Sequence, residues 1–528
     1  MIPMSRQEGN DLPVSAFMGR EDGTFPLGVT AYEKRGVAMD VPSWELSKCI
    51  QCNQCSIVCP HAVIRPVLLN EDEAKSAPEG YEMKPATGFP GLMYHLEISA
   101  MDCTGCGVCV KTCPAKEKAL VMTPLADVKE KSAENWAYSM TISQKPIEDK
   151  QKFTVKGSQF LQPYLQFSGA CAGCGETPYA KLITQLFGDR MMISNAAGCS
   201  HIWGGSPETP YCKNSKGQGP AWGCSLFEDN AEYGYGMLIG STVVREGLRH
   251  KAEEALKTLG GGNLKDKLAA WLEGFNGSSL TQERAEALTA ALEAEKGDNE
   301  LLNELYNRKD FFVKNSQWVF GGDGWAYDIG YGGLDHVLAS GDNINMIVFD
   351  TEVYSNTGGQ SSKATPTAAI AQFAASGKKT KKKDLGVMAM SYGYIYVAQI
   401  AMGADKAQTL KAIHEAESYD GPSLIIAYAP CINHGIKGGM SGSMDQAKRA
   451  VESGYWSLYR FDPRRKEAGE NPFVLDSKKP TASFRDYLMS EVRYSSLIKK
   501  FPEHAGALLE KAEKDAADRL EAYYRLAE

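Results

Sequence analysis

The sequence Gly-Gly-Asp-Gly-Trp-Ala-Tyr-Asp at residues 321–328, together with Val-Phe-Asp-Thr-Glu-Val-Tyr-Ser-Asn-Thr-Gly-Gly-Gln at residues 348–360, decides the fold. A β-prone run lies at each of these places, Gln317–Phe320 and Asn345–Phe349, and a segment of helical length separates the two runs. This order predicts a strand–turn–helix–strand unit, a kind of unit that binds phosphates. We therefore predict an α/β domain with a mostly parallel sheet and helices on both faces.

The polar, glycine-rich ends of these two runs predict a phosphate and metal site. Gly322 and Gly324 would let the backbone approach a diphosphate closely, and Asp323 supplies one hard oxygen ligand. Thr351, at the end of the second run, adds further polar atoms. Since Mg²⁺ commonly takes one or two protein oxygens together with phosphate oxygens, the arrangement predicts a magnesium diphosphate site. Gly-Asp-Gly alone is also typical of a hairpin turn, which is the alternative at this point.

Composition and charge limit what the protein can be. With 528 residues, 43% of them hydrophobic and 23% charged, the chain is long enough for more than one globular domain. A formal net charge of −8 argues against nucleic acid as a partner. The N-terminus lacks the basic and apolar segments of a signal peptide, so we expect a cytoplasmic protein. Fourteen cysteines in such a chain indicate metal or redox chemistry rather than a disulfide framework.

One uncharged segment, Leu385–Ala404, has the length of a membrane span. Its serine, glycine, glutamine and tyrosine residues favour a different interpretation, with a short buried strand at Leu385–Met390, then a turn and a buried helix. We therefore expect no membrane association.

Eight cysteines form two copies of the run Cys-x2-Cys-x2-Cys-x3-Cys-Pro, 54 residues apart. This is the ligand pattern of bacterial two-cluster ferredoxins, in which three close thiolates hold one [4Fe–4S] cluster and the fourth cysteine ligates the other cluster. The predicted ligand sets are Cys49, Cys52, Cys55 and Cys113 for one cluster, and Cys103, Cys106, Cys109 and Cys59 for the other. The alternative is a pair of four-cysteine zinc sites, which is less favoured because zinc knuckles usually separate two Cys-x2-Cys pairs by a longer loop.

Changes in composition along the chain indicate its domain organisation. The predicted order is an irregular lead-in (1–45), a small α+β ferredoxin-like domain (46–125), a linker (126–159), the α/β domain (160–483) and a helical C-terminal tail (484–528). Residues 64–99 are predicted to be a decorated surface loop of the ferredoxin-like domain. The Ala-, Leu-, Glu- and Lys-rich segment 260–308 is predicted to be a helical excursion of the α/β domain, without chemistry.

The six cysteines outside the two runs include candidate ligands of a third cluster. Cys199 and Cys431 each follow a predicted strand at its C-terminal end, as the predicted metal site does. In an open α/β sheet these ends meet at one edge, where ligands bind. Because Cys171 and Cys174 open a helix that could reach the same edge, we infer a third [4Fe–4S] cluster held by all four cysteines. Spacing alone leaves two replacements open, Cys212 and Cys224.

Five motifs together resemble the pyruvate:ferredoxin (flavodoxin) oxidoreductases over nearly the whole chain. They are the double cysteine run, Cys-Ala-Gly-Cys-Gly-Glu at 171–176, Gly-Cys-Ser-His-Ile-Trp-Gly-Gly at 198–205, Gly-Gly-Asp-Gly-Trp-Ala at 321–326 and Asp-Thr-Glu-Val-Tyr-Ser-Asn-Thr-Gly-Gly-Gln at 350–360. The resemblance implies thiamine diphosphate, bound through Mg²⁺ by Asp323, the Thr351 hydroxyl and the Val353 carbonyl. It also implies that Asn356 lies near the reacting carbons and that Glu176 contacts the cofactor. For the third cluster it implies Cys199 rather than its rivals, together with Cys171, Cys174 and Cys431.

The same resemblance implies an enzyme that oxidatively decarboxylates pyruvate to acetyl-CoA and CO₂. Electrons would pass through three [4Fe–4S] clusters to ferredoxin or flavodoxin, and coenzyme A would take the acetyl group. Because single-chain members of the family are about twice as long, we expect upstream domains on another chain or lost by truncation, and a dimeric assembly. Two alternatives stay open: an electron-transfer subunit with a vestigial thiamine site, and a sister 2-oxoacid:ferredoxin oxidoreductase acting on a bulkier acid.

Two further features are predicted to have secondary roles. The basic cluster Lys378–Lys383 is interpreted as a solvated loop, with steering of an acidic ferredoxin or an anionic substrate as the alternative. His201 and His434 closely follow candidate cluster cysteines, and we predict that they pack behind the ligands rather than transfer protons.

Overall fold

The computed structural model describes the chain except for residues 1, 6–7, 22–25, 206–208 and 279. Its centre is an eight-stranded sheet with the order β13-β12-β10-β11-β9-β8-β6-β7. The strands are β6 (Met191–Ala196), β7 (Ala221–Ser225), β8 (Ser316–Gly322), β9 (Asn345–Asp350), β10 (Tyr396–Ile400), β11 (Ser423–Tyr428), β12 (Tyr459–Phe461) and β13 (Phe473–Leu475). Neighbouring strands from β10 to β7 pair in parallel, whereas β12 and β13 add an antiparallel edge. The predicted α/β fold with a mostly parallel sheet is confirmed.

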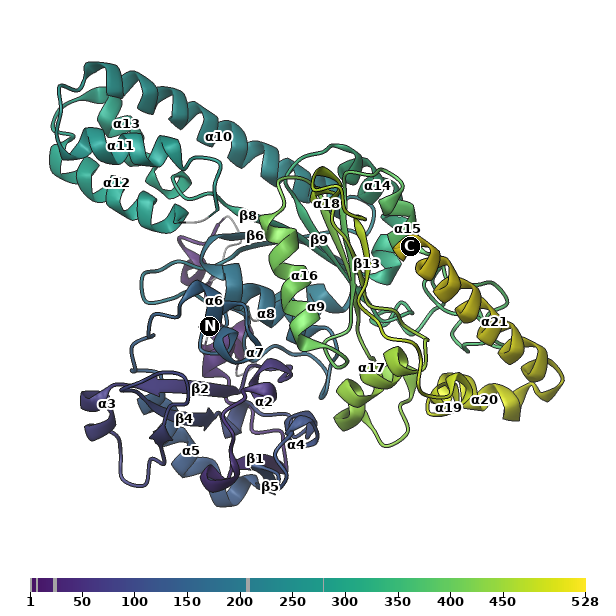
Figure 1. The fold of residues 1–528 in the computed structure, drawn as a ribbon. Coiled ribbons are helices and arrows are strands. Elements are labelled where there is room, and N and C mark those ends of the chain that lie inside the picture. The colour runs from purple at the N-terminus through teal and green to yellow at the C-terminus, as the bar shows by residue number, and fades with distance from the viewer. Residues whose placement is uncertain (1, 6–7, 22–25, 206–208, 279) are drawn as a thin grey trace.

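Helices cover both faces of this sheet (Figure 1). Those that pack on it include α8 (Thr177–Phe187), α14 (Tyr331–Ala339), α15 (Leu385–Met390), α16 (Lys406–Ser418) and α17 (Ser443–Glu452). On β8, Trp318 and Phe320 pack with α8 and α16, while Val319 packs with α14 and α15. Successive strand side chains point to opposite faces, so a continuous apolar run fits a strand that is buried on both sides.

The N-terminal part folds into a smaller domain that confirms the predicted ferredoxin-like fold. Its cysteine-bearing helices are α2 (Gln54–Ile57) and α4 (Val108–Thr112). Its strands pair as β1 (Asp40–Trp44) with β5 (Leu120–Pro124), and as a three-stranded sheet of β2 (Ile64–Leu69), β4 (Met93–Ile98) and β3 (Lys84–Pro85). Residues 64–99 therefore carry a paired sheet and are not the decorated loop that we predicted, because Ile64, Leu96 and Ile98 are buried in the domain core.

The segment that we predicted as a linker, residues 126–159, contains helices. They are α5 (Leu125–Ser139), α6 (Asp149–Lys152) and α7 (Val155–Ser158). In α5 the Trp136 ring lies 5.8 Å from the Phe167 ring, and both side chains belong to the core of the smaller domain. Near α2 the Asn53 side chain donates a hydrogen bond to the Lys156 carbonyl at 2.9 Å. The segment thus packs against the ferredoxin-like domain over much of its length.

A helical lobe projects from the sheet on the long helix α10 (Asn230–Thr258) (Figure 1). Its other helices are α11 (Asn263–Glu273), α12 (Thr281–Glu295) and α13 (Glu300–Asn307). Leu268, Trp271, Leu288 and Leu305 form a core of its own. The segment 260–308 is therefore helical, as its composition indicates. The chain ends in α19 (Phe484–Met489), α20 (Val492–Lys500) and α21 (Pro502–Ala527).

The structure reverses the order of elements that we predicted within Leu385–Ala404. Leu385–Met390 is helix α15, and strand β10 follows it. The Asp384 side chain accepts a hydrogen bond from the Val387 amide at 3.1 Å and caps the helix. The strand prediction was wrong because a short apolar run fits a buried strand or a buried helix equally well. None of the helices in the described part of the chain is long and apolar enough to cross a membrane.

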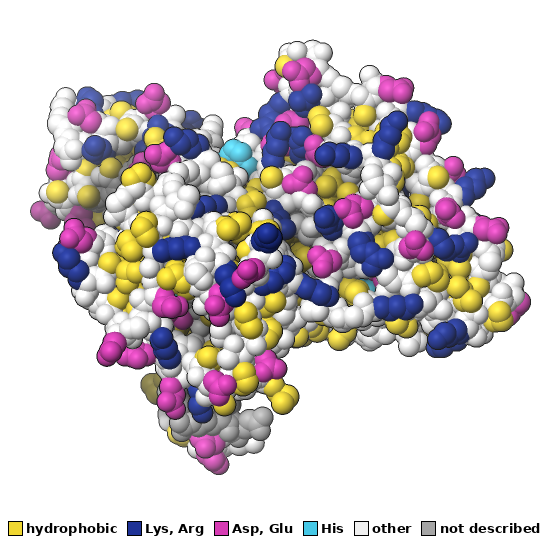
Figure 2. All heavy atoms as spheres, turned by 60° about the horizontal axis from the view of Figure 1, so that its bottom comes forward, with side chains coloured by type: hydrophobic (Ala, Val, Ile, Leu, Met, Phe, Trp, Pro, Cys, Tyr) yellow, Lys and Arg dark blue, Asp and Glu magenta, His cyan; other side chains and the backbone are white. Residues whose placement is uncertain are grey.

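The surface carries charges of both signs. On the face shown in Figure 2, Lys and Arg side chains are interspersed with Asp and Glu side chains, and hydrophobic side chains lie among them. That face therefore does not present the continuous basic surface that is typical of nucleic-acid binding.

Candidate active site

Four neighbouring parallel strands bring the predicted site residues to one edge of the large sheet. These strands lie in the order β11, β9, β8, β6. Beyond their C-terminal ends the chain reaches Cys431, Thr351, Asp323 and Cys199, in that order. Because the C-terminal ends of parallel strands form the ligand crevice of an open α/β sheet, residues far apart in the sequence meet here.

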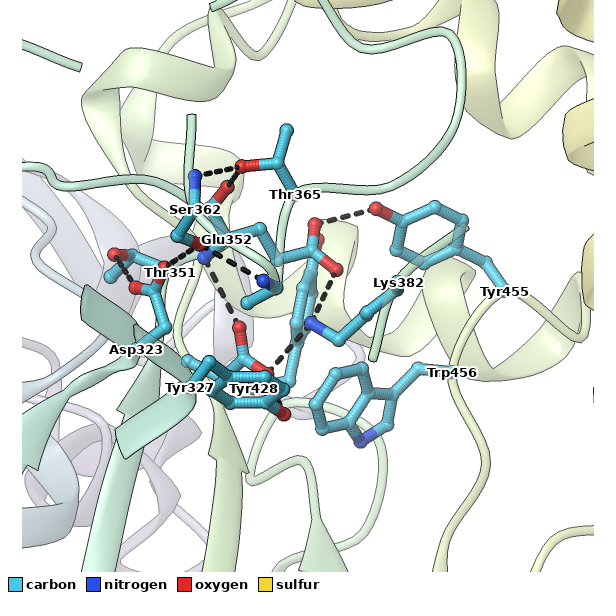
Figure 3. Close-up of polar contacts among 12 residues, drawn as sticks. Asp323, Tyr327, Thr351, Glu352, Ser362, Thr365, Lys382, Tyr428, Tyr455 and Trp456 are labelled. Carbon is cyan, nitrogen blue, oxygen red and sulfur yellow. Dashed lines mark hydrogen bonds and ion pairs between the residues drawn. The ribbon is translucent and has the colours of Figure 1, made fainter. Parts of the chain in front are cut away.

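Three oxygen atoms converge where the sequence predicts a magnesium ion. The Thr351 Oγ1 atom lies 3.0 Å from Asp323 Oδ1 and 3.1 Å from the Val353 carbonyl oxygen. The Ser362 hydroxyl, which sequence reasoning missed, donates a hydrogen bond to Asp323 Oδ2 at 2.5 Å (Figure 3). All four residues are buried. Hard oxygen donors that include a carboxylate are a donor set that fits Mg²⁺.

The electrostatics of Asp323 also favour a bound cation. Burial raises the pKa of this carboxyl group well above its ordinary value, and the Asp350 carboxylate raises it further. The Ser362 hydrogen bond and the Lys382 charge oppose this effect only in part. A divalent ion at the carboxylate would stabilise its charged form and so reverse the shift.

A small cavity of about 20 Å³ lies beside these oxygen atoms and is lined in part by Gly322, Gly324 and Asn356. A Cβ atom at Gly324 would lie 2.4 Å from a ring carbon of Tyr354, so no side chain fits there. A Cβ atom at Gly322 would meet only the Phe349 carbonyl oxygen, at 3.8 Å. Gly322 therefore borders open space, as the close approach of a diphosphate requires.

A second cavity, of about 120 Å³, brings together the cysteines predicted for the third cluster. Its lining includes Cys171, Cys174, Cys199 and Cys431. The two alternatives lie elsewhere: Cys212 is buried beside Pro163, and Cys224 is on the edge strand β7. The structure thus assembles the set that strand ends and the resemblance indicate.

The two cavities share part of their walls. Glu176, Thr351 and Asn356 line both of them. Glu176 is 4% exposed and accepts a hydrogen bond of 2.6 Å from the Trp203 indole nitrogen. Burial raises the pKa of Glu176 to about 7, against the opposing effect of this bond. Sequence reasoning missed Trp203 as a partner, although it lies within the quoted stretch 198–205.

The cysteines of the smaller domain form two sets. Burial raises the pKa of Cys55, and negative charge on Cys52, Cys49 and Cys113 raises it further, so these four cysteines lie close together. The other set lines a small cavity of its own, made in part by Cys59, Cys103, Cys106 and Cys109. The fourth cysteine of each run therefore joins the first three of the other run, as in a two-cluster ferredoxin.

In the described ranges, no three Cys, His, Asp or Glu side chains converge closely enough to hold one metal ion. All fourteen cysteines are free of disulfides.

One backbone contact joins the third cysteine set to the smaller domain. The backbone of Gly173, between Cys171 and Cys174, lies close enough to the Cys106 sulfur to lower the pKa of that thiol. Gly173 has a φ of +77°, and a Cβ atom there would lie 2.6 Å from the Met440 carbonyl oxygen. The contact between these two candidate cluster sites therefore requires glycine.

A buried charge network, missed by sequence reasoning, holds the turn 351–353 (Figure 3). Glu352 has a φ of +62°, a left-handed conformation that costs free energy for any residue except glycine. Lys382 Nζ lies 2.7 Å from Asp350 and 3.1 Å from Glu352. Arg493 Nη2 lies 2.8 Å from the other oxygen of Glu352. Two cations thus hold the residue that separates two predicted magnesium ligands.

The same contacts correct the interpretation of Lys378–Lys383 as a solvated loop. Lys379 and Lys381 are exposed, but the Lys382 side chain is only 9% exposed. The Lys382 ammonium group is paired because two buried carboxylates need a counter-charge. One lysine of the cluster therefore belongs to the support of the site.

Three known families match parts of the chain. A family described as a 4Fe-4S dicluster domain matches residues 48–117, and the C-terminal TPP binding domain of thiamine pyrophosphate enzymes matches residues 312–427. A domain of unknown function, EKR, matches residues 1–38. Fold and site together define an iron–sulfur protein with a thiamine diphosphate-binding domain.

Curated proteins with similar sequences indicate which kind of iron–sulfur and thiamine diphosphate protein this chain resembles. Pyruvate-flavodoxin oxidoreductase of Klebsiella pneumoniae is 59% identical over 526 residues, which are 99% of this chain and 45% of the relative. Pyruvate:ferredoxin oxidoreductase of Moorella thermoacetica is 55% identical over 534 residues. The match covers 100% of this chain and 45% of the relative. Both relatives match this chain through their C-terminal part, and the chain spans about half of their length.

The names of these relatives and the match to a TPP binding domain agree with the expected oxidoreductase. A solved structure of 2-oxoglutarate:ferredoxin oxidoreductase from Magnetococcus marinus is 14% identical, with a TM-score of 0.30 over 63% of this chain and 87% of the other. That likeness is too weak to support an argument.

Proposed function

We propose that this chain supplies the diphosphate half of the thiamine site and the electron exit of an enzyme that oxidatively decarboxylates pyruvate, with coenzyme A, to acetyl-CoA and CO₂. The observation that carries the proposal is the wall that the two cavities share, which is formed by Glu176, Cys199, Thr351, Ser355 and Asn356. A cofactor that gives up electrons would lie directly against a group that accepts them.

Five residues hold the diphosphate end of the cofactor in this proposal. Asp323, the Thr351 hydroxyl and the Val353 carbonyl bind Mg²⁺, and Gly322 and Gly324 let the diphosphate approach the backbone. Thiamine diphosphate, when bound, supplies an electron sink for the loss of CO₂ from a 2-oxoacid. The chain's own contribution is to place the cofactor by means of rigid, buried donors at the ends of β8 and β9.

The reacting end of the cofactor is assigned to the shared wall. Asn356 would face the reacting carbons, and Glu176 would contact the cofactor from the side of the cysteine cavity. Both side chains can form hydrogen bonds that orient a bound ligand.

Electrons would leave through three [4Fe–4S] clusters. The first is held by Cys171, Cys174, Cys199 and Cys431. The backbone contact from Gly173 to Cys106 leads to the second, held by Cys59, Cys103, Cys106 and Cys109. The third, held by Cys49, Cys52, Cys55 and Cys113, would pass electrons to ferredoxin or flavodoxin.

Other parts of the assembly would complete the active site. Because the chain spans 45% of its relatives, we assign the groups that hold the 2-oxoacid and activate the rest of the thiamine to upstream domains, on another chain or lost by truncation. A dimeric assembly belongs to the same proposal. So does a cytoplasmic location, because a reducing compartment keeps fourteen thiols free of disulfides.

The first test of the proposal is anaerobic purification with iron and thiamine analysis. The second is an assay of pyruvate- and coenzyme A-dependent dye reduction with the upstream domains co-expressed. Three clusters require about twelve irons per chain, and a count of about eight would argue against the first cluster.

Asp323→Ala should abolish Mg²⁺-dependent binding of thiamine diphosphate, with Asp328→Ala as a control. Absence of binding by the wild type would contradict the proposal. Comparing pyruvate with a bulkier 2-oxoacid identifies the preferred substrate.

A further inference from the structure

Helix α8 connects the cysteine cavity to the ferredoxin-like domain. It begins directly after Cys174 and Glu176, and all of its residues are buried. Its Tyr179 and Ile183 share one apolar cluster with Ile57 and Val108 of the smaller domain. The helix therefore lies on the route between the first candidate cluster and the other two.

Lys181 of α8 reaches across this interface to α2. Its side chain is 2% exposed, and its ammonium group donates hydrogen bonds to the backbone carbonyls of Ser56 and, at 3.1 Å, Ile57. No carboxylate is among the groups that shift the pKa of Lys181, and the described part of the chain gives it no ion pair. Lysine is rarely buried without a counter-charge, so this position calls for a compensating anion.

The available anions are cysteine thiolates. Burial lowers the pKa of Lys181 to about 8, while Cys59 and Cys55 raise it and Arg65 lowers it further. Ser56 and Ile57 lie in α2 between Cys55, which belongs to one four-cysteine set, and Cys59, which belongs to the other. The lysine charge therefore lies between the two candidate cluster sites of the smaller domain.

We propose that Lys181 is a positioning residue that raises the reduction potentials of the two ferredoxin-type clusters and so directs electrons out of the first cluster. The proposal rests on the proposed function. In each step one electron leaves one cluster, which is oxidised, and reduces the next, and no bond forms or breaks. A nearby positive charge stabilises the reduced cluster, which carries one more negative charge than the oxidised cluster.

The test is an anaerobic redox titration followed by electron paramagnetic resonance, on the holoenzyme with its upstream domains. Lys181→Met and Lys181→Gln should keep their iron and shift both ferredoxin-type clusters to more negative potentials, whereas Lys181→Arg should stay near the wild type. Lys145→Met is the control, because Lys145 is 12% exposed and its ammonium group is paired with Glu73.

Two outcomes would overturn the proposal. Unchanged potentials in both neutral variants would exclude an electrostatic role. Loss of iron from both neutral variants, with iron kept in Lys181→Arg, would assign Lys181 to assembly of the interface alone. If iron analysis showed that the wild type lacks clusters, the proposed function would be wrong. That result is distinct from unchanged potentials in a wild type and variants that hold their clusters, which would contradict only the role of Lys181.

Discussion

The Nε2 atom of His434 lies 2.7 Å from the carbonyl oxygen of Thr351, where neither residue is more than 2% exposed. The carbonyl can only accept, so the imidazole donates. His434 follows Cys431 by three residues, and Thr351 is a predicted magnesium ligand. One hydrogen bond therefore connects the loop of a candidate cluster ligand to the loop of the candidate metal site.

Removal of this bond should weaken the metal site. His434→Leu leaves the buried Thr351 carbonyl without this donor, at an expected cost of roughly 1–3 kcal/mol in the free energy of unfolding. Mg²⁺-dependent binding of thiamine diphosphate should weaken as well, which calorimetry measures. His434→Gln, whose amide can still donate, is the matched control, and equal effects of both substitutions would argue against the bond.

His434 should also make stability depend on pH. Burial, helped by the Arg493 charge, lowers the pKa of His434 to about 4 from 6.5. Between these values the unfolded chain binds a proton that the folded chain does not, so stability present above pH 6.5 is lost as the pH falls toward 4. The expected loss is roughly 3 kcal/mol. Urea unfolding at several pH values should show a shallower dependence for His434→Gln, and identical slopes would count against this account.

Removing one partner of the ion pair between Arg493 and Glu352 should cost more stability than removing one partner of a surface pair. Both side chains are at most 2% exposed, so Arg493→Met leaves buried carboxylates short of counter-charge and should cost about 3–5 kcal/mol. Arg525→Met is the control, because its pair with Glu521 is exposed and should contribute less than about 1 kcal/mol. Similar losses of stability in the two variants would refute the assignment.

The third cluster can be tested by counting iron. Cys431→Ala should lower the iron content by about four per chain, because the candidate cluster loses a ligand. Cys212→Ala should leave the iron content unchanged, since Cys212 is buried away from the cysteine cavity. Loss of iron from Cys212→Ala alone would reverse the assignment.

Gly173 should be intolerant of a side chain. Gly173→Ala forces a Cβ atom toward the Met440 carbonyl and should move the backbone contact with Cys106. Freeze-quench spectroscopy should then show slower reduction of the two ferredoxin-type clusters. Gly88→Ala is the control, because Gly88 also has a positive φ but nothing within 4 Å of its Cβ position. Equal rates in the two variants would show that the crowding at Gly173 has no effect.

The sequence by itself determined the two cysteine runs and the strand ends at Asp323, Thr351 and Cys431. These features depend on residues close together in the chain, whose spacing or apolar run is visible without a structure. Local pattern failed at Leu385–Met390 because a short apolar run does not distinguish a strand from a helix.

Only the tertiary structure decided how the site is supported. Glu352 meets Lys382 and Arg493, and Lys181 meets the carbonyl of Ser56, across separations in sequence that no local pattern spans. These contacts arise because sheet order and domain packing bury charges that must then find partners. Spacing indicates which residues can bind iron and magnesium, whereas packing decides which distant charges hold them in place.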